Sequence, residues 1–127
     1  MIRVYVATAK PEERAALRLM LLDLDLQVVG EASDWFTTLA QAPATNFNLL
    51  LVDWDMLPMN AATGLQELRR SSTTYAVIVV LTSNLDSSKQ AALADGADLF
   101  ISKSEIPDLM AGKLQFLAEN IENESAH

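Results

Sequence analysis

Short apolar runs alternate along the chain with longer amphipathic segments. The apolar runs are rich in Val, Leu and Ile and do not alternate strictly with polar residues, which is typical of strands covered on both faces. The pattern predicts five strands, over residues 2–7, 26–30, 49–53, 76–82 and 99–102.

The amphipathic segments between these runs predict five helices. Pro11, followed by Glu12 and Glu13, opens the first helix, because proline and acidic residues are favoured in a first helical turn. Ser33 and Asp34 open the second helix, which runs toward Ala42. Helices over 61–70, 86–94 and 106–120 complete the set.

Strands and helices that alternate with short connections predict an α/β fold of (βα)5 order. Single short strands separated by helices pair in parallel through right-handed crossovers, which gives a three-layer open sheet. We expect one domain over residues 1–121 and a polar tail over 122–127. In this architecture the functional site lies at the carboxyl ends of the strands.

Composition excludes several classes of function. The 127 residues carry 9 Lys and Arg against 17 Asp and Glu, and the net charge of −8 disfavours direct binding to nucleic acid. The chain has no Cys, and its one histidine is His127, which excludes thiol and Ser-His-Asp catalysis and Cys or His metal sites. No apolar stretch reaches the ~20 residues of a membrane span, and Met1 begins no signal-peptide pattern, so we expect a soluble cytoplasmic protein.

Three polar residues stand at the ends of predicted strands: Asp53, Thr82 and Lys103. A lone Asp after a strand is usually a turn or cap residue. Together, however, a carboxylate nucleophile, a hydroxyl and an ammonium suit phosphoryl transfer, in which a metal ion usually neutralises the remaining charge. The combination favours a phosphoryl-transfer site at this edge.

Several segments make the chain similar, over almost its whole length, to the receiver domain of two-component response regulators. The resemblance implies a flavodoxin-like fold with sheet order 2-1-3-4-5. It also implies that Asp53 is the phosphoacceptor, Thr82 the switch hydroxyl, Lys103 the phosphate-binding lysine and Phe100 the aromatic switch. The segments that carry it are 2–7, 28–32, 50–53 with Pro58, 79–83 and 94–103.

The sequence departs from this family at the metal site. Receiver domains place two acidic residues after the first strand, where this chain has Thr8 and Ala9. Because Mg2+ is normally held by carboxylates, Asp53 alone should bind it poorly. Asp55 is a weak candidate for a second ligand, whereas Glu12 is better explained as a charge that complements a helix dipole.

The resemblance implies a signalling module rather than an enzyme. We expect phosphorylation of Asp53, or a partner, to bias Thr82, Phe100 and the face of the fourth helix, fifth strand and fifth helix. That face would bind a second copy or a signalling partner, and the phosphodonor would be a sensor histidine kinase. The last helix carries apolar residues at helical spacing: Ile106, Leu109, Met110, Leu114 and Leu117.

Two alternatives remain open. In one, Asp53 is never phosphorylated and the fold is a constitutive interaction scaffold. In the other, residues 49–55, Thr82 and Lys103 are the three motifs of a haloacid-dehalogenase-type phosphatase, although the chain after Lys103 is too short for that core.

Other conspicuous side chains have simpler interpretations. We expect Trp54 to overhang the mouth of the acceptor pocket, and Arg69 with Arg70 to form a solvated helix end that favours the dipole. Packing in the core or at its rim is expected for Trp35, Phe36, Met20, Met56, Met59 and Met110.

Overall fold

A computed structural model describes residues 2–71, 76–83, 96–104 and 107–125. The predicted helix over 86–94 and residue Ile106 lie outside the described residues. The elements are β1 (Arg3–Ala7), α1 (Pro11–Asp23), β2 (Gln27–Ala32), α2 (Trp35–Gln41), the 3-10 turn η1 (Ala42–Thr45), β3 (Leu49–Asp53), the 3-10 turn η2 (Trp54–Met56), α3 (Ala61–Ser71), β4 (Val77–Thr82), β5 (Leu99–Ser102) and α5 (Pro107–Ser125).

The five strands form one parallel sheet in the order β2-β1-β3-β4-β5, so the predicted fold class and strand order are confirmed. The register aligns the carboxyl ends of the central strands. Ala7 of β1 lies opposite Val52 of β3, and the next residue of β3, Asp53, lies opposite Leu81 of β4. Thr82 in turn lies opposite Ser102 of β5. The ends of four strands therefore meet at one edge.

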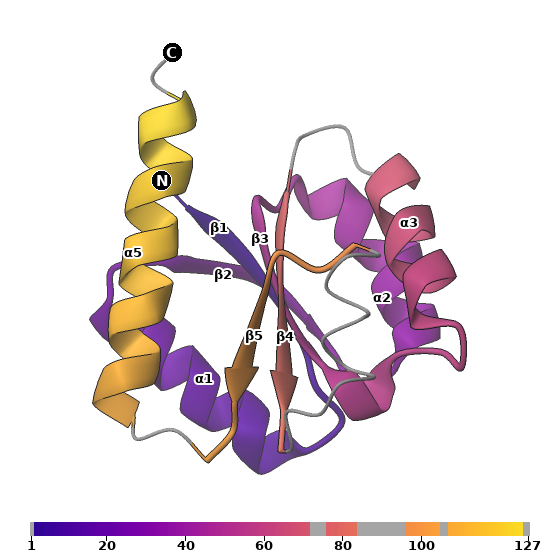
Figure 1. The fold of residues 1–127 in the computed structure, drawn as a ribbon, viewed down its shortest axis with the longest axis horizontal. Helices are drawn as coiled ribbons and strands as arrows, with labels where there is room; N and C mark the ends of the chain where they lie inside the picture. The colour runs from indigo at the N-terminus through magenta and orange to yellow at the C-terminus, as the bar shows by residue number, and fades with distance from the viewer. Residues whose placement is uncertain (1, 72–75, 84–95, 105–106, 126–127) are drawn as a thin grey trace.

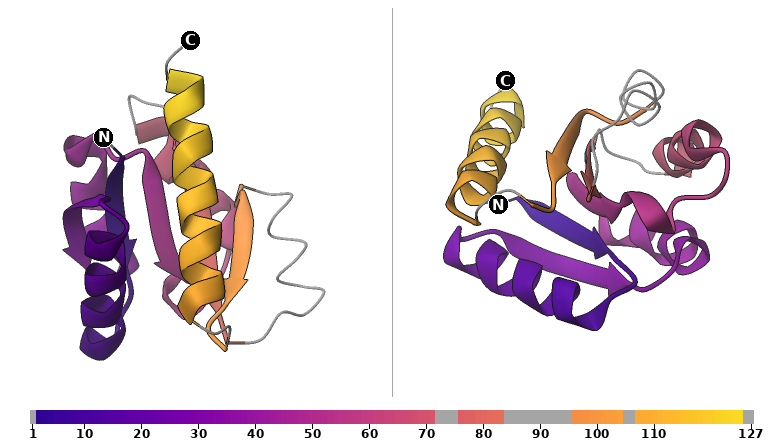
Figure 2. Two further views of the ribbon diagram at one scale, coloured as in Figure 1. Left: turned by 90° about the vertical axis from the view of Figure 1, so that its left-hand side faces the viewer. Right: turned by 60° about the horizontal axis from the view of Figure 1, so that its bottom comes forward.

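Helices cover both faces of the sheet, with α1 and α5 on one side and α2 and α3 on the other (Figures 1 and 2). Successive strand residues contribute to opposite cores, because side chains along a strand point alternately to its two faces. In β3, Leu49 and Leu51 pack on the side of α1 and α5, whereas Leu50 and Val52 pack on the side of α2 and α3. This burial on both faces explains the continuous apolar runs of the sequence.

The helix starts follow the predicted signals. Pro11 is the first residue of α1, with Glu12 and Glu13 in its first turn. Asp34 caps α2 by accepting a hydrogen bond from the backbone N of Thr37 at 2.7 Å. The hydrogen bonds from the backbone and hydroxyl of Thr37 lower the pKa of Asp34 below its ordinary value.

The prediction that Arg69 is a solvated residue at a helix end is wrong. Its Nη1 donates to the carbonyl of Ala76 at 2.7 Å, and its Nη2 donates to the carbonyl of Gly96 at 2.8 Å and to Asp98 Oδ2 at 2.7 Å. The same carboxylate oxygen accepts from the backbone N of Ile78 at 2.8 Å. Arg69 therefore joins the end of α3 to the starts of β4 and β5, and only Arg70 is the solvated helix-end residue.

Other boundaries and side chains also differ from the predictions. The helix α5 continues to Ser125, through most of the expected polar tail, and β2 extends to Ala32. Phe36 and Met59 are exposed rather than packed, whereas the remaining side chains of that group are buried or partly buried. None of the helices in the described ranges combines the length and apolar character that crossing a bilayer requires.

Candidate functional site

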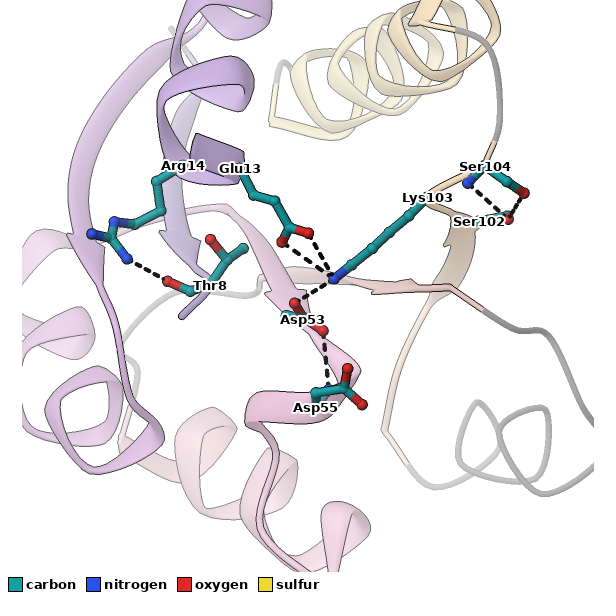
Figure 3. Close-up of polar contacts among 8 residues, drawn as sticks. All are labelled: Thr8, Glu13, Arg14, Asp53, Asp55, Ser102, Lys103 and Ser104. Atoms are coloured by element: carbon teal, nitrogen blue, oxygen red, sulfur yellow. Dashed lines mark hydrogen bonds and ion pairs between the residues drawn. The ribbon is translucent and has the colours of Figure 1, made fainter. Parts of the chain in front are cut away.

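Asp53 ends the fully buried strand β3 and is itself only 4% exposed. Its Oδ1 accepts a hydrogen bond from the backbone N of Asp55 at 3.0 Å. Its Oδ2 accepts one from Lys103 Nζ at 2.5 Å (Figure 3). Both oxygens of this buried carboxylate are thus engaged, and the structure brings together the acid and the lysine that the sequence singled out.

Lys103 follows β5, and its backbone N donates to the carbonyl of Thr82 at 2.8 Å. This bond extends the β4–β5 pairing by one residue and fixes the start of the lysine side chain at the sheet edge. Burial alone lowers the pKa of Lys103, but hydrogen bonds from the ammonium to Asp53 and Glu13 outweigh this effect, so the pKa lies above its ordinary value. The ammonium is therefore charged at neutral pH.

Phe100 lies in β5, the strand that ends just before Lys103, and Thr82 ends the neighbouring strand β4. Thr82 is buried at the end of β4, and Phe100 is buried in β5 on the side of α2 and α3. The ring centroid of Trp54 lies 6.1 Å from that of Phe100, at an interplanar angle of 50°. Trp54, the residue directly after Asp53, therefore contacts the predicted aromatic switch, and its expected position over the pocket mouth stays a prediction.

The positions where receiver domains have two acidic residues hold no carboxylate here. Thr8 is fully buried, and its Oγ1 finds no hydrogen-bond partner in the described part of the chain. The carbonyl of Thr8 accepts from Arg14 Nη1 at 2.7 Å, and Ala9 is exposed. The carboxylate of Asp55 also lies on an exposed residue, whose contact with Asp53 is made by its backbone amide.

These residues do not fit an ordinary Mg2+ site. Mg2+ keeps strict octahedral geometry and is bound through one or two carboxylates together with phosphate and water. Here one oxygen of Asp53 carries an ammonium, and the nearby Thr8 hydroxyl is neutral. Across residues 2–71, 76–83, 96–104 and 107–125, Asp, Glu, His and Cys side chains form no group of three that could hold a metal ion.

Glu13 is part of the site, although its sequence position predicted only a charge in the first turn of a helix. Both of its carboxylate oxygens accept hydrogen bonds from Lys103 Nζ, each at 3.2 Å. The signal was its spacing, because Glu13 lies four residues before Leu17 and eight before Leu21, which are both buried. Residues at this spacing share one helix face. Glu12, which is exposed, has the ordinary first-turn position.

The Glu13–Lys103 pair borders a hollow of about 220 Å³ between α1 and α5. The other lining residues are apolar: Ala16, Leu17, Met20, Leu81, Pro107 and Met110. The side chain of Glu13 is 30% exposed and that of Lys103 20%, against 6% for Asp53. Solvent exposure therefore increases across the cluster, from the buried candidate nucleophile Asp53 through Lys103 to the partly exposed Glu13.

Chemically, the site presents a carboxylate beside an ammonium at the carboxyl edge of a parallel sheet. The carboxylate supplies a nucleophile, and the ammonium stabilises negative charge that develops on a group bound next to it. This arrangement suits transfer of a phosphoryl group to Asp53.

Known proteins share the sequence pattern and the fold of this chain. Residues 4–115 match the response regulator receiver domain family. The chain is 28% identical over 109 residues to the nitrate/nitrite response regulator protein NarP of Escherichia coli K12. The aligned residues make up 85% of this chain and 51% of NarP. It is 33% identical over 84 residues to NarL of the same strain, and this alignment includes 66% of this chain and 39% of NarL. The chain thus spans about half or less of the length of these relatives.

The fold is also close to solved structures. A CheY-like response regulator receiver domain protein from Methanospirillum hungatei JF-1 superposes with a TM-score of 0.83 at 19% identity, over 98% of both chains. This likeness concerns the fold alone, whereas the family match covers most of the sequence. The chain belongs to the response regulator receiver domain family, the receiver module of two-component signal transduction.

Proposed function

We propose that this receiver domain is phosphorylated on Asp53 and acts through protein–protein interaction. The observation that carries the proposal is the contact of Lys103 Nζ with Asp53 Oδ2 at the sheet edge, beside the end of β4 at Thr82. Receiver domains are generally signalling domains without enzymatic activity, and they interact with sensor kinases. A sensor histidine kinase is therefore the phosphodonor that we propose.

The proposed reaction uses a phosphodonor and the side chains of Asp53, Lys103 and Thr82. An Asp53 oxygen attacks the donor's phosphorus and forms an O–P bond, while the bond from phosphorus to the donor's leaving group breaks and that group keeps the electron pair. Lys103 then binds an oxygen of the new acyl phosphate, and the hydroxyl of Thr82 is the proposed second contact. We propose that Phe100 changes its position when Asp53 is phosphorylated, because it contacts the ring of Trp54, the residue next to Asp53.

Receiver domains typically bind Mg2+ at their phosphorylation site, and we propose that this domain binds it weakly. Thr8 and Ala9 support this proposal because neither supplies a carboxylate. Asp55 is the remaining weak candidate, since it lies within two residues of Asp53. Phosphorylation should then depend less on the metal and more on Lys103 than in an ordinary receiver.

We propose that the output surface includes β5 and the outer face of α5. Leu109 and Phe116 are exposed there, 57% and 64% respectively, whereas Met110 and Leu114 pack in the core. Leu117 is partly buried against that core. A second copy or a signalling partner would cover the exposed apolar side chains, and the predicted contribution of the fourth helix lies outside the described residues.

The test compares the chain with Asp53→Asn after treatment with acetyl phosphate, read by intact mass with and without Mg2+. We expect slow addition of one phosphoryl group that is lost in Asp53→Asn. Restoring the acidic pair by Thr8→Asp with Ala9→Asp should strengthen Mg2+ binding and speed the reaction. Tight Mg2+ binding with rapid modification of the unaltered chain would contradict the atypical metal site.

A constitutive scaffold is the second candidate function. The observation that favours it is the occupation of both Asp53 oxygens, by Asp55 N and by a lysine that also binds Glu13. Complete absence of modification, also in the variant with restored acids, would support the scaffold. The phosphatase alternative finds no support, because residues 4–115, which include all three of its proposed motifs, match the receiver domain family.

A further inference from the structure

We propose that Glu13 is a positioning residue that opposes phosphoryl binding at Asp53 by holding the ammonium of Lys103. The inference rests on the proposed function of Asp53 as the phosphoacceptor, and it adds a residue that lies outside the acidic pair, the acceptor, the hydroxyl and the lysine of the family's motifs. Two causes would then lower the reactivity of Asp53: the missing acidic pair and the competition of Glu13 for Lys103.

The geometry shows that Lys103 is shared. Its Nζ lies 3.2 Å from each oxygen of Glu13 and 2.5 Å from Asp53 Oδ2. The ammonium thus uses its hydrogen-bonding capacity on two carboxylates, one from the first turn of α1 and one from the end of β3. Figure 3 shows Nζ lying between the two carboxyl groups.

The charges of this cluster do not balance. Glu13 and Asp53 contribute two negative charges and Lys103 contributes one positive charge. Arg14, in the same turn of α1 as Glu13, binds the carbonyl of Thr8 and lies 3.7 Å from Glu31, so its positive charge is paired outside this cluster. The cluster therefore already carries an excess negative charge before a phosphoryl group arrives.

Phosphorylation makes this imbalance larger. An Asp53 oxygen forms the O–P bond while the bond to the leaving group breaks with its electron pair, and the product phosphoryl group carries about two negative charges. Lys103 must then serve the phosphoryl oxygens while Glu13 competes for the same ammonium. Because the site is partly buried, repulsion between Glu13 and the phosphoryl group is screened less than at a free surface.

The first experiment measures anion binding without any covalent step. Inorganic phosphate is titrated into the unaltered chain, Glu13→Gln and Glu12→Gln, and binding is followed by the NMR resonance of the Lys103 ε-methylene group. Glu12 is the matched control, because it is the exposed neighbour on the same helical turn and its substitution changes the net charge equally. We expect phosphate affinity to rise about tenfold in Glu13→Gln, a gain worth roughly 1.4 kcal/mol, and less than twofold in Glu12→Gln.

Two further readouts separate positioning from a general structural effect. Titration of the same resonance with pH should show a lower pKa for Lys103 in Glu13→Gln, because a hydrogen bond that raises this pKa is lost. Raising the ionic strength should reduce the difference in phosphate affinity between Glu13→Gln and the unaltered chain. Glu13→Asp, which keeps the charge but withdraws it by one methylene group, should give an intermediate phosphate affinity.

The second experiment measures the rate of modification of the same variants by acetyl phosphate, with acetate as the leaving group. We expect the rate to rise severalfold in Glu13→Gln and to stay unchanged in Glu12→Gln. Higher phosphate affinity with no covalent product in any variant would uphold the role of Glu13 and refute Asp53 as a phosphoacceptor. Equal phosphate affinity in all three chains would refute the role of Glu13, and modification lost in Asp53→Asn would then still uphold the acceptor.

Discussion

Replacing Arg69 by Met removes the contacts that join α3 to β4 and β5 while keeping a long side chain of good helix propensity. Arg69 donates to the carbonyls of Ala76 and Gly96 and to Asp98 Oδ2. After the substitution, the two carbonyls lose a charged donor, and Asp98 loses its ion pair but keeps its bond from Ile78 N. The site residues at the far end of β4 and β5 depend on these strands being in register.

The expected cost follows from the number and exposure of these bonds. A hydrogen bond from a charged group contributes about 1.5–3 kcal/mol when buried, but less where water reaches it. The side chains of Arg69 and Asp98 are 28% and 31% exposed, so their ion pair contributes at most about 1 kcal/mol. We expect Arg69→Met to lower the free energy of unfolding by about 3 kcal/mol and Tm by about 10 °C.

Urea unfolding followed by circular dichroism measures this change, with Arg70→Met as the control. Arg70 is exposed on the same helical turn, so its substitution should change stability by less than about 0.5 kcal/mol. Equal unfolding midpoints for the two variants would refute the reasoning, because the structural difference between Arg69 and Arg70 would then have no energetic counterpart.

Other predictions concern the glycines and the cap of α2. A Cβ on Gly64 would lie 2.6 Å from Pro58 Cγ, so Gly64→Ala should lower the free energy of unfolding by about 1–3 kcal/mol. Gly112 faces open space, so Gly112→Ala should raise the free energy of unfolding by about 0.5–1 kcal/mol. Urea unfolding midpoints test both variants, and equal shifts would contradict the geometry. Asp34→Ala should lower Tm at neutral pH, because the Thr37 hydrogen bonds are lost. Because these bonds lower the pKa of Asp34, their contribution is full above its ordinary value of 3.8 and is lost as pH falls through the lowered pKa. An effect of Asp34→Ala on Tm that does not diminish as pH falls below 3.8 would contradict this reasoning.

Much of the fold follows from local pattern. Strands buried on both faces must be continuous apolar runs, and β3 reads as such a run from Leu49 to Val52. Helix starts are equally local, because Pro11 and Asp34 act on backbone groups within one turn. Parallel pairing through helical crossovers then directs Asp53 and Lys103 to the same edge, so their proximity was predictable.

The contacts that adjust the site are not local. Glu13 and Lys103 are 90 residues apart, and Arg69 and Gly96 are 27 apart. Whether a charged side chain meets such a partner or stays in water depends on the helix rotation and the loop path that bring the two segments together. Sequence spacing predicts a helix face, as for Glu13 and Leu17, but not the partner that lies beyond it.

The sequence by itself therefore determined the five strands, their parallel pairing and the three residues at the strand ends, because these depend on side-chain periodicity and on the handedness of the chain. The strand order was predicted from the resemblance to receiver domains and not from periodicity. Only the tertiary structure decided that Lys103 is divided between two carboxylates, that Trp54 lies against Phe100 and that Arg69 is bonded while Arg70 is solvated. These outcomes depend on differences of a few ångströms between packed elements. Such distances are set by the whole core and not by any one segment of it.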